Sequence, residues 1–413
     1  MLQLSKLTKI FIITLLLSPV MYYLFFLWTG LTFSVVLRIL VIFLGILYLF
    51  KFESRIKVPG YAVFLLFFVL YGLIHPMITG LDREGSIIRF FYGNNHLAMF
   101  FMLIIINNTN FSAKFIRNAG MFLTVTVIVA SIVSILQVFD HGILNPNQFT
   151  VLQQDGGGIF ELYKIRRVSI FGFVGSNALG LSFIPLLSVL VGIVLFQRKK
   201  TIWPIVILGG IVAFLTNTRY VMVGYLIVLF QTLFYSQVRV LGVVKYVVIT
   251  LFSVLVIYFA VLNFGYNINE WIDNRLFPEG SLTETTRYKA IGTFHSFFPE
   301  APYFGTGEMT TSILIESRSA GSSHIHVGYL SHLVIYGIVG CFFLFGAWLL
   351  MARQLFKNAR ITGYWGSFFA MLTFLWSFLT MSESSLFFAG IVIAFVYDKF
   401  FMDAINKQQI AQL

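Results

Sequence analysis

The sequence predicts an all-α polytopic membrane protein with about twelve transmembrane helices, and three observations support this fold class. Of its 413 residues, 58% are hydrophobic and only 11% are charged. Its mean hydropathy is +0.89, and apolar stretches long enough to cross a bilayer recur along the whole chain. Soluble globular domains carry roughly 25% charged and 45–50% apolar residues. An ordinary cytosolic enzyme and a disordered chain are therefore excluded.

Each predicted transmembrane helix is an apolar stretch of about 20 residues, the length that crosses the hydrocarbon core. The first stretch follows Lys6 and Lys9 as a signal peptide would. It continues through aromatic residues without an A-x-A-like site, so we expect it to be retained. We interpret residues 1–413 as one integral membrane domain. The expected spans are residues 10–28, 31–50, 58–78, 88–106, 119–138, 171–196, 202–217, 219–236, 244–264, 326–351, 363–380 and 384–401.

The net charge of +12 at first points to a nucleic-acid partner. Basic residues of short loops stay in the cytoplasm, however, and this rule gives the topology. With the N-terminus inside, the inner loops hold 17 basic and three acidic residues, and the outer loops hold ten basic and 13 acidic ones. Only Arg38 then lies within a span. The basic excess is therefore a topology signal, both termini are expected in the cytoplasm, and no nucleic-acid partner is expected.

Two outer loops, residues 139–170 and 265–325, are too long to be simple turns. In the larger one, Ser281 and Glu284 have the spacing of a capping box, which predicts the start of a helix. Pro299 ends that helix. We expect an amphipathic helix on the outer leaflet. Its apolar face is predicted to carry Arg287, Ile291, Phe294 and Phe298.

The outer basic residues are mostly arginine, whereas only six of the 17 inner ones are. An Arg guanidinium binds phosphate at two points and tolerates partial loss of water, so this bias predicts an anionic ligand. The alternative is that the outer arginines pair with the outer acidic residues. The eight outer arginines are Arg83, Arg89, Arg166, Arg167, Arg219, Arg275, Arg287 and Arg318.

Two arginines are placed at or inside the membrane. Arg219 follows a short polar turn between two spans, where an ionic partner interacts more strongly than in bulk water. The alternative for Arg219 is a helix-end side chain that reaches up to the interface. Arg38 lies inside its span and is costly there unless it is paired. Glu383 is one possible partner, and both a functional and a structural role stay open for Arg38.

All seven histidines fall on the outer side or in the outer part of a span. His324 and His326 stand where the large loop re-enters the membrane, and a neutral imidazole there can take a proton from a hydroxyl. The H-x-H pattern is also half a metal site, but no third ligand stands at a suitable spacing. His332 is expected to be a packed polar residue. The sequence has no D-x-D, P-loop or G-x-S-x-G motif. We therefore expect chemistry without a metal or cofactor.

Three blocks of sequence carry a resemblance to a known family. They are NTRYVMVGYLIVL with Arg219, TRYKAIGTFHSFFPEAPYFGTGEM with Arg287, Gly305 and Gly307, and SSHIHVGYLSHLVIYGIVG with His326. Their order, spacing and common outer placement resemble the O-antigen polymerase and O-antigen ligase family of bacterial envelope glycosyltransferases. That family acts on sugars linked to undecaprenyl diphosphate.

A fourth block, RRVSIFGFVGSNALGLSFIP, is similar to the family's Asn-containing stretch, with Asn177 at the Asn. The resemblance covers roughly residues 165–345. Val327 stands where the family usually has Asn after its histidine, and His324 lies two residues before His326. Either histidine therefore fits the family's position.

The resemblance implies a GT-C-like glycosyltransferase in the bacterial inner membrane, with its site on the periplasmic side. Arg219 and Arg287 would stabilise the diphosphate of the lipid-linked donor, and His326 or His324 would deprotonate the acceptor hydroxyl. The aromatic residues of the loop helix, Tyr288 among them, would hold the polyprenyl tail or cover the site, or else pack the loop. Further substrate-binding candidates are Arg38, Arg89, Arg166, Arg167, Asn177 and Arg318.

The motifs leave the acceptor open. A polymerase adds the glycan to the next lipid-linked repeat unit, and we favour it because the chain matches the family consensus loosely. A ligase transfers the glycan to lipid A core. A flippase for the same lipid-linked sugars is the alternative from another class, but it would place polar groups at the midplane, which is nearly free of charge. A chain-length regulator and a flippase of the same pathway are the expected protein partners.

Overall fold

The computed structural model of the chain describes a large part of it, and every structural statement below refers to that part. The described residues are 2–16, 33–51, 56–79, 95–139, 183–197, 202–215, 219–234, 248, 286–306, 327–380 and 389–411.

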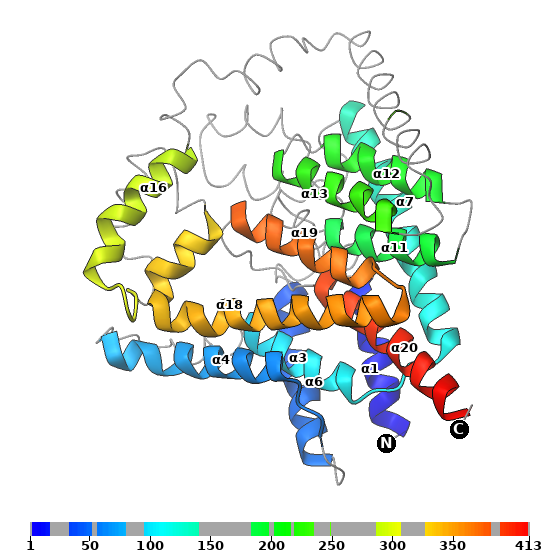
Figure 1. Cartoon of the computed structure of the whole chain (residues 1–413), viewed down its shortest axis with the longest axis horizontal. Helices are drawn as coiled ribbons and strands as arrows, with labels where there is room; N and C mark the ends of the chain where they lie inside the picture. The colour runs from blue at the N-terminus through cyan, green and yellow to red at the C-terminus, as the bar shows by residue number, and fades with distance from the viewer. Residues whose placement is uncertain are drawn as a thin grey trace.

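These residues are almost entirely helical and contain no strand (Figure 1). Apolar residues with few breakers favour this outcome, because in an apolar setting each helix satisfies its own backbone hydrogen bonds. The α-helices are α1 (Leu2–Leu16), α3 (Phe33–Lys51), α4 (Gly60–Thr79), α6 (Asn95–Asn107), α7 (Ala113–Phe139), α11 (Ile184–Phe196), α12 (Ile202–Leu215), α13 (Arg219–Phe230), α16 (Thr286–Phe297), α18 (Gly328–Thr362), α19 (Gly366–Thr380) and α20 (Ala389–Ala411). Two short 3-10 helices, η2 (Gln231–Phe234) and η4 (Phe298–Glu300), follow α13 and α16.

The described helices agree with the predicted all-α fold class. Every expected span overlaps a described helix except residues 244–264, which lie outside the described residues apart from Val248. Helix α16 coincides with the helix expected in the large loop. Two helical stretches, Ala113–Val133 and Gly328–Thr362, are long and apolar enough to cross a membrane. Seven further apolar helices are shorter.

The lateral surface of the bundle is apolar. On α18, Phe342 is 61% exposed and Leu349 is 70% exposed, whereas Leu344 and Trp348 on the other face are buried. A helix that is apolar on every side is typical of a protein whose surroundings are themselves apolar. Soluble monomers rarely expose apolar surface of this extent.

The helices pack closely through small residues. Helix α11 lies against α19, and a Cβ atom on Gly192 would stand 2.4 Å from the Cα atom of Gly366. The Tyr364 hydroxyl donates to the carbonyl oxygen of Val189 at 3.3 Å across the same contact. Glycine at such a crossing lets two backbones approach, as is common between transmembrane helices. Helix α18 packs mainly on α4 and α19.

The bundle has two distinct ends. The chain termini lie close together at one end, and α16 lies at the opposite end (Figure 1). At the end near the termini, the Asn358 side chain of α18 donates to Asp398 Oδ2 of α20 at 2.6 Å. The other end holds the starts of α13 and α18 and the last turn of α19, and it carries the residues that the sequence singles out.

Candidate functional site

Helices α13 and α18 begin beside the last turn of α19. Nε1 of Trp376 in α19 donates to the carbonyl oxygen of Tyr220 at 3.0 Å. The Tyr329 hydroxyl in α18 donates to the carbonyl oxygen of Leu375 at 3.4 Å. These two bonds join three helices at one end of the bundle. The turns that follow Arg219 and His326 in the sequence therefore both contact α19.

The two arginines predicted to bind the diphosphate lie in the first turns of their helices. Arg219 is the first residue of α13, and Arg287 is the second residue of α16. The first turn of a helix presents free N–H groups and a positive partial charge, which favour a nearby anion. The backbone positions of both residues therefore suit the predicted role, while their side chains lie outside the described atoms.

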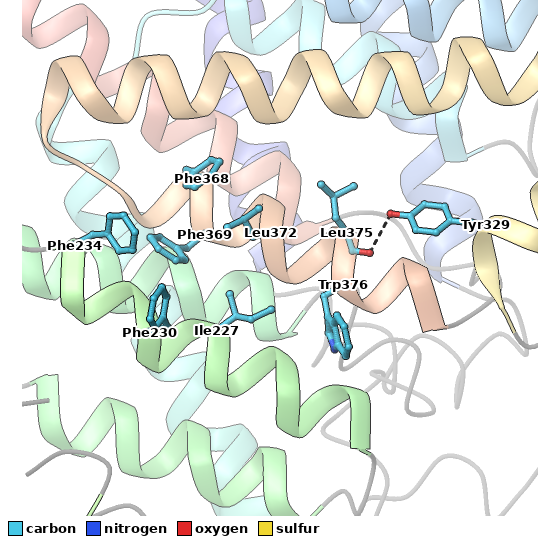
Figure 2. Close-up of a pocket in the computed structure, with 9 residues that line it drawn as sticks. All are labelled: Ile227, Phe230, Phe234, Tyr329, Phe368, Phe369, Leu372, Leu375 and Trp376. Atoms are coloured by element: carbon cyan, nitrogen blue, oxygen red, sulfur yellow. Dashed lines mark hydrogen bonds between the residues drawn. The ribbon is translucent and has the colours of Figure 1, made fainter. Parts of the chain in front are cut away.

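An apolar groove of about 420 Å³ runs between α13 and α19. Figure 2 shows Phe230 and Phe234 towards one end and Trp376 and Tyr329 towards the other. Because Trp376 is bonded to Tyr220, the second end adjoins the start of α13, next to Arg219. A groove of this kind suits a hydrocarbon chain whose polar end lies at Arg219. Its lining residues are Ile227, Phe230, Phe234, Tyr329, Phe368, Phe369, Leu372, Leu375 and Trp376.

The segment from Ala301 to Thr306, which we call the PYFGT segment, contacts α18 where that helix is broken. Gly337 interrupts α18 with φ 63° and ψ −172°, and Gly305 has φ 77°. The N–H of Ile338 donates to the carbonyl oxygen of Pro302 at 2.9 Å. The structure thus joins two motif blocks that are separate in the sequence, because Gly305 belongs to one block and Gly337 to the other.

Two side chains of α4 also reach the PYFGT segment. The Tyr71 hydroxyl shares its one proton between the carbonyl oxygen of Phe304, at 2.6 Å, and that of Tyr336, at 2.9 Å. The His75 ring, through Nε2, donates to the same Phe304 carbonyl. Sequence reasoning did not single out either residue as part of a site. The available signal was a Tyr and a His four residues apart on one face of an otherwise apolar helix.

Helix α16 is packed onto the start of α18 by its aromatic side chains. Phe294, Phe297 and Phe298 pack with Val334 of α18. Phe294 and Phe298 stack with ring centroids 4.7 Å apart. Of the two roles that the sequence allowed for these three residues, the structure shows packing of the loop. Ile291, predicted on the same face, is 42% exposed, and the side chain of Tyr288 lies outside the described atoms.

Three histidines are buried among aromatic rings inside the bundle. His75, His96 and His332 are each 2% exposed. His332 donates through Nδ1 to the carbonyl oxygen of Gly328 at 2.8 Å, so it is a packed polar residue, as the sequence predicts. The ring of His96 meets that of Phe68 edge to face at 4.9 Å.

The remaining predicted residues differ in how far the structure describes them. Arg38 is 4% exposed, so its side chain lies inside the bundle and not on the lateral surface. In the described ranges, no three His, Cys, Asp or Glu side chains come together as a metal site would require. The predicted residues that lie outside the described part of the chain are Arg89, Arg166, Arg167, Asn177, Gly307, Arg318, His324, His326 and Glu383.

Comparison of the sequence with protein-family models and with curated proteins gives no match. At this end of the bundle, the apolar groove ends beside the start of α13, where Arg219 stands, and α16, which carries Arg287 in its first turn, packs on the first turns of α18. In the sequence, His324 and His326 come immediately before α18.

Proposed function

We propose that the protein is a polysaccharide polymerase of the bacterial inner membrane. It transfers a polyprenyl-diphosphate-linked glycan onto the next lipid-linked repeat unit at the periplasmic face. One observation carries the proposal: the apolar groove between α13 and α19 ends beside the first turn of α13, where Arg219 stands. A ligand that fills both places has a long apolar chain and an anionic head. The motif resemblance supports the same class of donor.

The proposed reaction is a displacement at the anomeric carbon of the donor sugar. The acceptor hydroxyl forms a bond to that carbon while the bond from carbon to the diphosphate oxygen breaks. Polyprenyl diphosphate leaves with the electron pair, and the hydroxyl proton passes to His326 or His324. Arg219 and Arg287 stabilise the charge that grows on the leaving diphosphate. No step in this scheme needs a metal ion.

The groove gives a direct test of where the polyprenyl chain binds. Replacing Ile227 by Trp fills the groove with extra volume, and overpacking of about 1–3 kcal/mol corresponds to a rise of about 5- to 150-fold in the KM of a long-chain donor. The measurement is KM with a long-chain and with a short-chain lipid-linked repeat unit. We expect the short-chain donor to be affected much less.

Leu226→Trp is the matched control for this variant, because Leu226 precedes Ile227 on the same helix and is 53% exposed, away from the groove lining. We expect Leu226→Trp to keep the KM of the unchanged protein for both donors. If the two Trp variants behave alike with the long-chain donor, the chain does not lie in this groove.

A purified-component assay tests the activity itself. The protein in liposomes, supplied only with lipid-linked repeat units, is expected to produce a ladder of polymer on the lipid carrier. A gene deletion separates the two acceptors: a polymerase leaves single repeats attached to lipid A core, whereas a ligase leaves polymer unattached. Movement of lipid-linked repeats across the liposome membrane without any polymer would instead identify a flippase and refute the proposal.

A further inference from the structure

The break in α18 leaves backbone groups without their usual partners inside the helix. At such a break in an apolar setting, each unsatisfied group costs several kcal/mol, so breaks persist only where other groups replace the lost bonds. Here the PYFGT segment supplies most of the replacements. The N–H groups of Ile338 and Val339 donate to the carbonyl oxygens of Pro302 and Tyr303 at 2.9 and 3.0 Å. The N–H of Thr306 donates to the carbonyl oxygen of Val334 at 2.8 Å.

The contact is too close for any side chain at its two glycines. A Cβ atom on Gly305 would lie 2.4 Å from the backbone nitrogen of Gly337 and the carbonyl oxygen of Ile335. A Cβ atom on Gly337 would lie 2.4 Å from the carbonyl oxygen of Tyr303. The segment and the helix therefore meet backbone to backbone. We call this contact between the PYFGT segment and α18 at Gly337 the joint, and it has little room to shift.

Helix α4 also stabilises this joint, through two side chains that hydrogen-bond to it. The Tyr71 hydroxyl bonds to a carbonyl on each side of it, that of Phe304 in the PYFGT segment and that of Tyr336 just before the break. His75 adds a second donor to the Phe304 carbonyl. These two side chains therefore tie the loop segment and the broken helix to α4 together.

The joint connects the two segments that the proposed function uses. On one side, the PYFGT segment follows α16 through only the short helix η4, and α16 carries Arg287. On the other side, the break sets the direction of the first turns of α18, which begins two residues after His326. One rigid connection therefore sets the positions of the Arg287 helix and the His326 segment relative to each other.

We propose that Tyr71 and His75 are positioning residues, which act through the PYFGT segment to hold Arg287 and His326 in register for the transfer step. This role rests on the proposed function, while the joint itself can be tested separately. Neither residue lines the groove, so donor binding should survive their loss. Misplacing reacting groups by about 1 Å can cost about 100-fold in rate, so kcat should carry the effect.

The experiment measures the joint and the activity in the same protein. In a Cys341→Ser background, Tyr303→Cys and Ile338→Cys place thiols on exposed residues at the two sides of the joint. We expect oxidation to cross-link them in the full-length membrane protein. Tyr71→Phe combined with His75→Leu should greatly reduce the cross-link and lower kcat by about 10- to 100-fold, with the donor KM little changed.

Two variants serve as controls. His75→Gln keeps an N–H donor at a similar distance from the backbone. When it replaces His75→Leu in the double variant, much of the cross-link and of kcat should be restored. Tyr397→Phe removes another buried hydroxyl, one that donates to the carbonyl oxygen of Ile116 at 3.0 Å elsewhere in the bundle, and should change neither readout.

The outcomes distinguish failure of the positioning role from failure of the proposed polymerase function. A double variant that keeps both the cross-link and kcat overturns the positioning role, as does loss of the cross-link with unchanged kcat. A fall in kcat with the cross-link intact shows that Tyr71 and His75 act in another way and also overturns it. Failure of the proposed function would appear differently, as a protein that cross-links normally but forms no polymer in any variant.

Discussion

Replacing Arg219 by alanine is expected to abolish long polysaccharide in a complementation gel, and Arg287→Ala is expected to do the same. Arg219 begins α13 beside the end of the apolar groove, so the diphosphate of a donor whose chain lies in the groove falls at this residue. Loss of one preorganised charge that stabilises a transition state typically costs about 100- to 1,000-fold in rate. We expect a loss of this order in kcat for each variant.

The same variants need a measure of folding and a matched control. Immunoblots of the membrane fraction should show both proteins at the normal level. Arg360→Ala is the control, because Arg360 is an exposed arginine at the opposite end of α18 from Tyr329 and does not line the groove. Arg219→Lys should recover only a small part of the activity, since an ammonium lacks the two-point geometry of a guanidinium. Normal ladders from Arg219→Ala or Arg287→Ala would overturn the assignment.

Replacing Gly337 by alanine is expected to cause a large loss of stability. Gly337 has φ 63° and ψ −172°, a conformation that is almost confined to glycine and costs other residues about 1–3 kcal/mol. The added Cβ would also lie 2.4 Å from the Tyr303 carbonyl oxygen, and overpacking of this kind costs about 1–3 kcal/mol more. The expected total loss in the free energy of unfolding is about 2–6 kcal/mol.

Thermal unfolding of the purified protein in detergent measures this effect, as a midpoint lowered by several degrees. Gly292→Ala is the matched control: Gly292 lies in α16, and a Cβ atom there has no other atom within 4 Å. Alanine is the better helix former by about 1 kcal/mol, so this variant should be neutral or slightly more stable. An unchanged midpoint for Gly337→Ala would show that the backbone contact between Gly337 and the PYFGT segment is not formed.

Helix α18 shows how far the sequence predicts the fold and where it stops. The apolar pattern predicts a span over residues 326–351, and α18 does begin at Gly328. The helix continues to Thr362, because helical hydrogen bonding does not end where the apolar run ends. The break at Gly337 was not predicted, since a glycine inside an apolar run is compatible with an unbroken helix. The break is stabilised by a contact with a segment more than 30 residues earlier.

In the candidate site, too, some residues could be predicted from the sequence and others only from the structure. Arg219 could be singled out because it stands in a short polar turn between two apolar spans, and Arg287 because it belongs to a motif of the large outer loop. Both signals are local in the sequence. The groove could not, because its lining side chains are ordinary apolar residues of α13, α18 and α19. Tyr71 and His75 likewise could not be identified from the sequence, because their role depends on hydrogen bonds to Phe304, more than 200 positions away.

The sequence by itself determined the helical fold class. It also predicts the spans and their orientation, because the free energy of placing a residue in a membrane adds up along a local stretch of chain. Tertiary structure decided which helix ends meet. The bond from Trp376 to Tyr220 and those from Tyr71 and His75 to Phe304 join residues 156 to 233 positions apart. Such contacts depend on how helices pack side by side. Hydropathy is a property of each local stretch, so it does not specify which helices pack together.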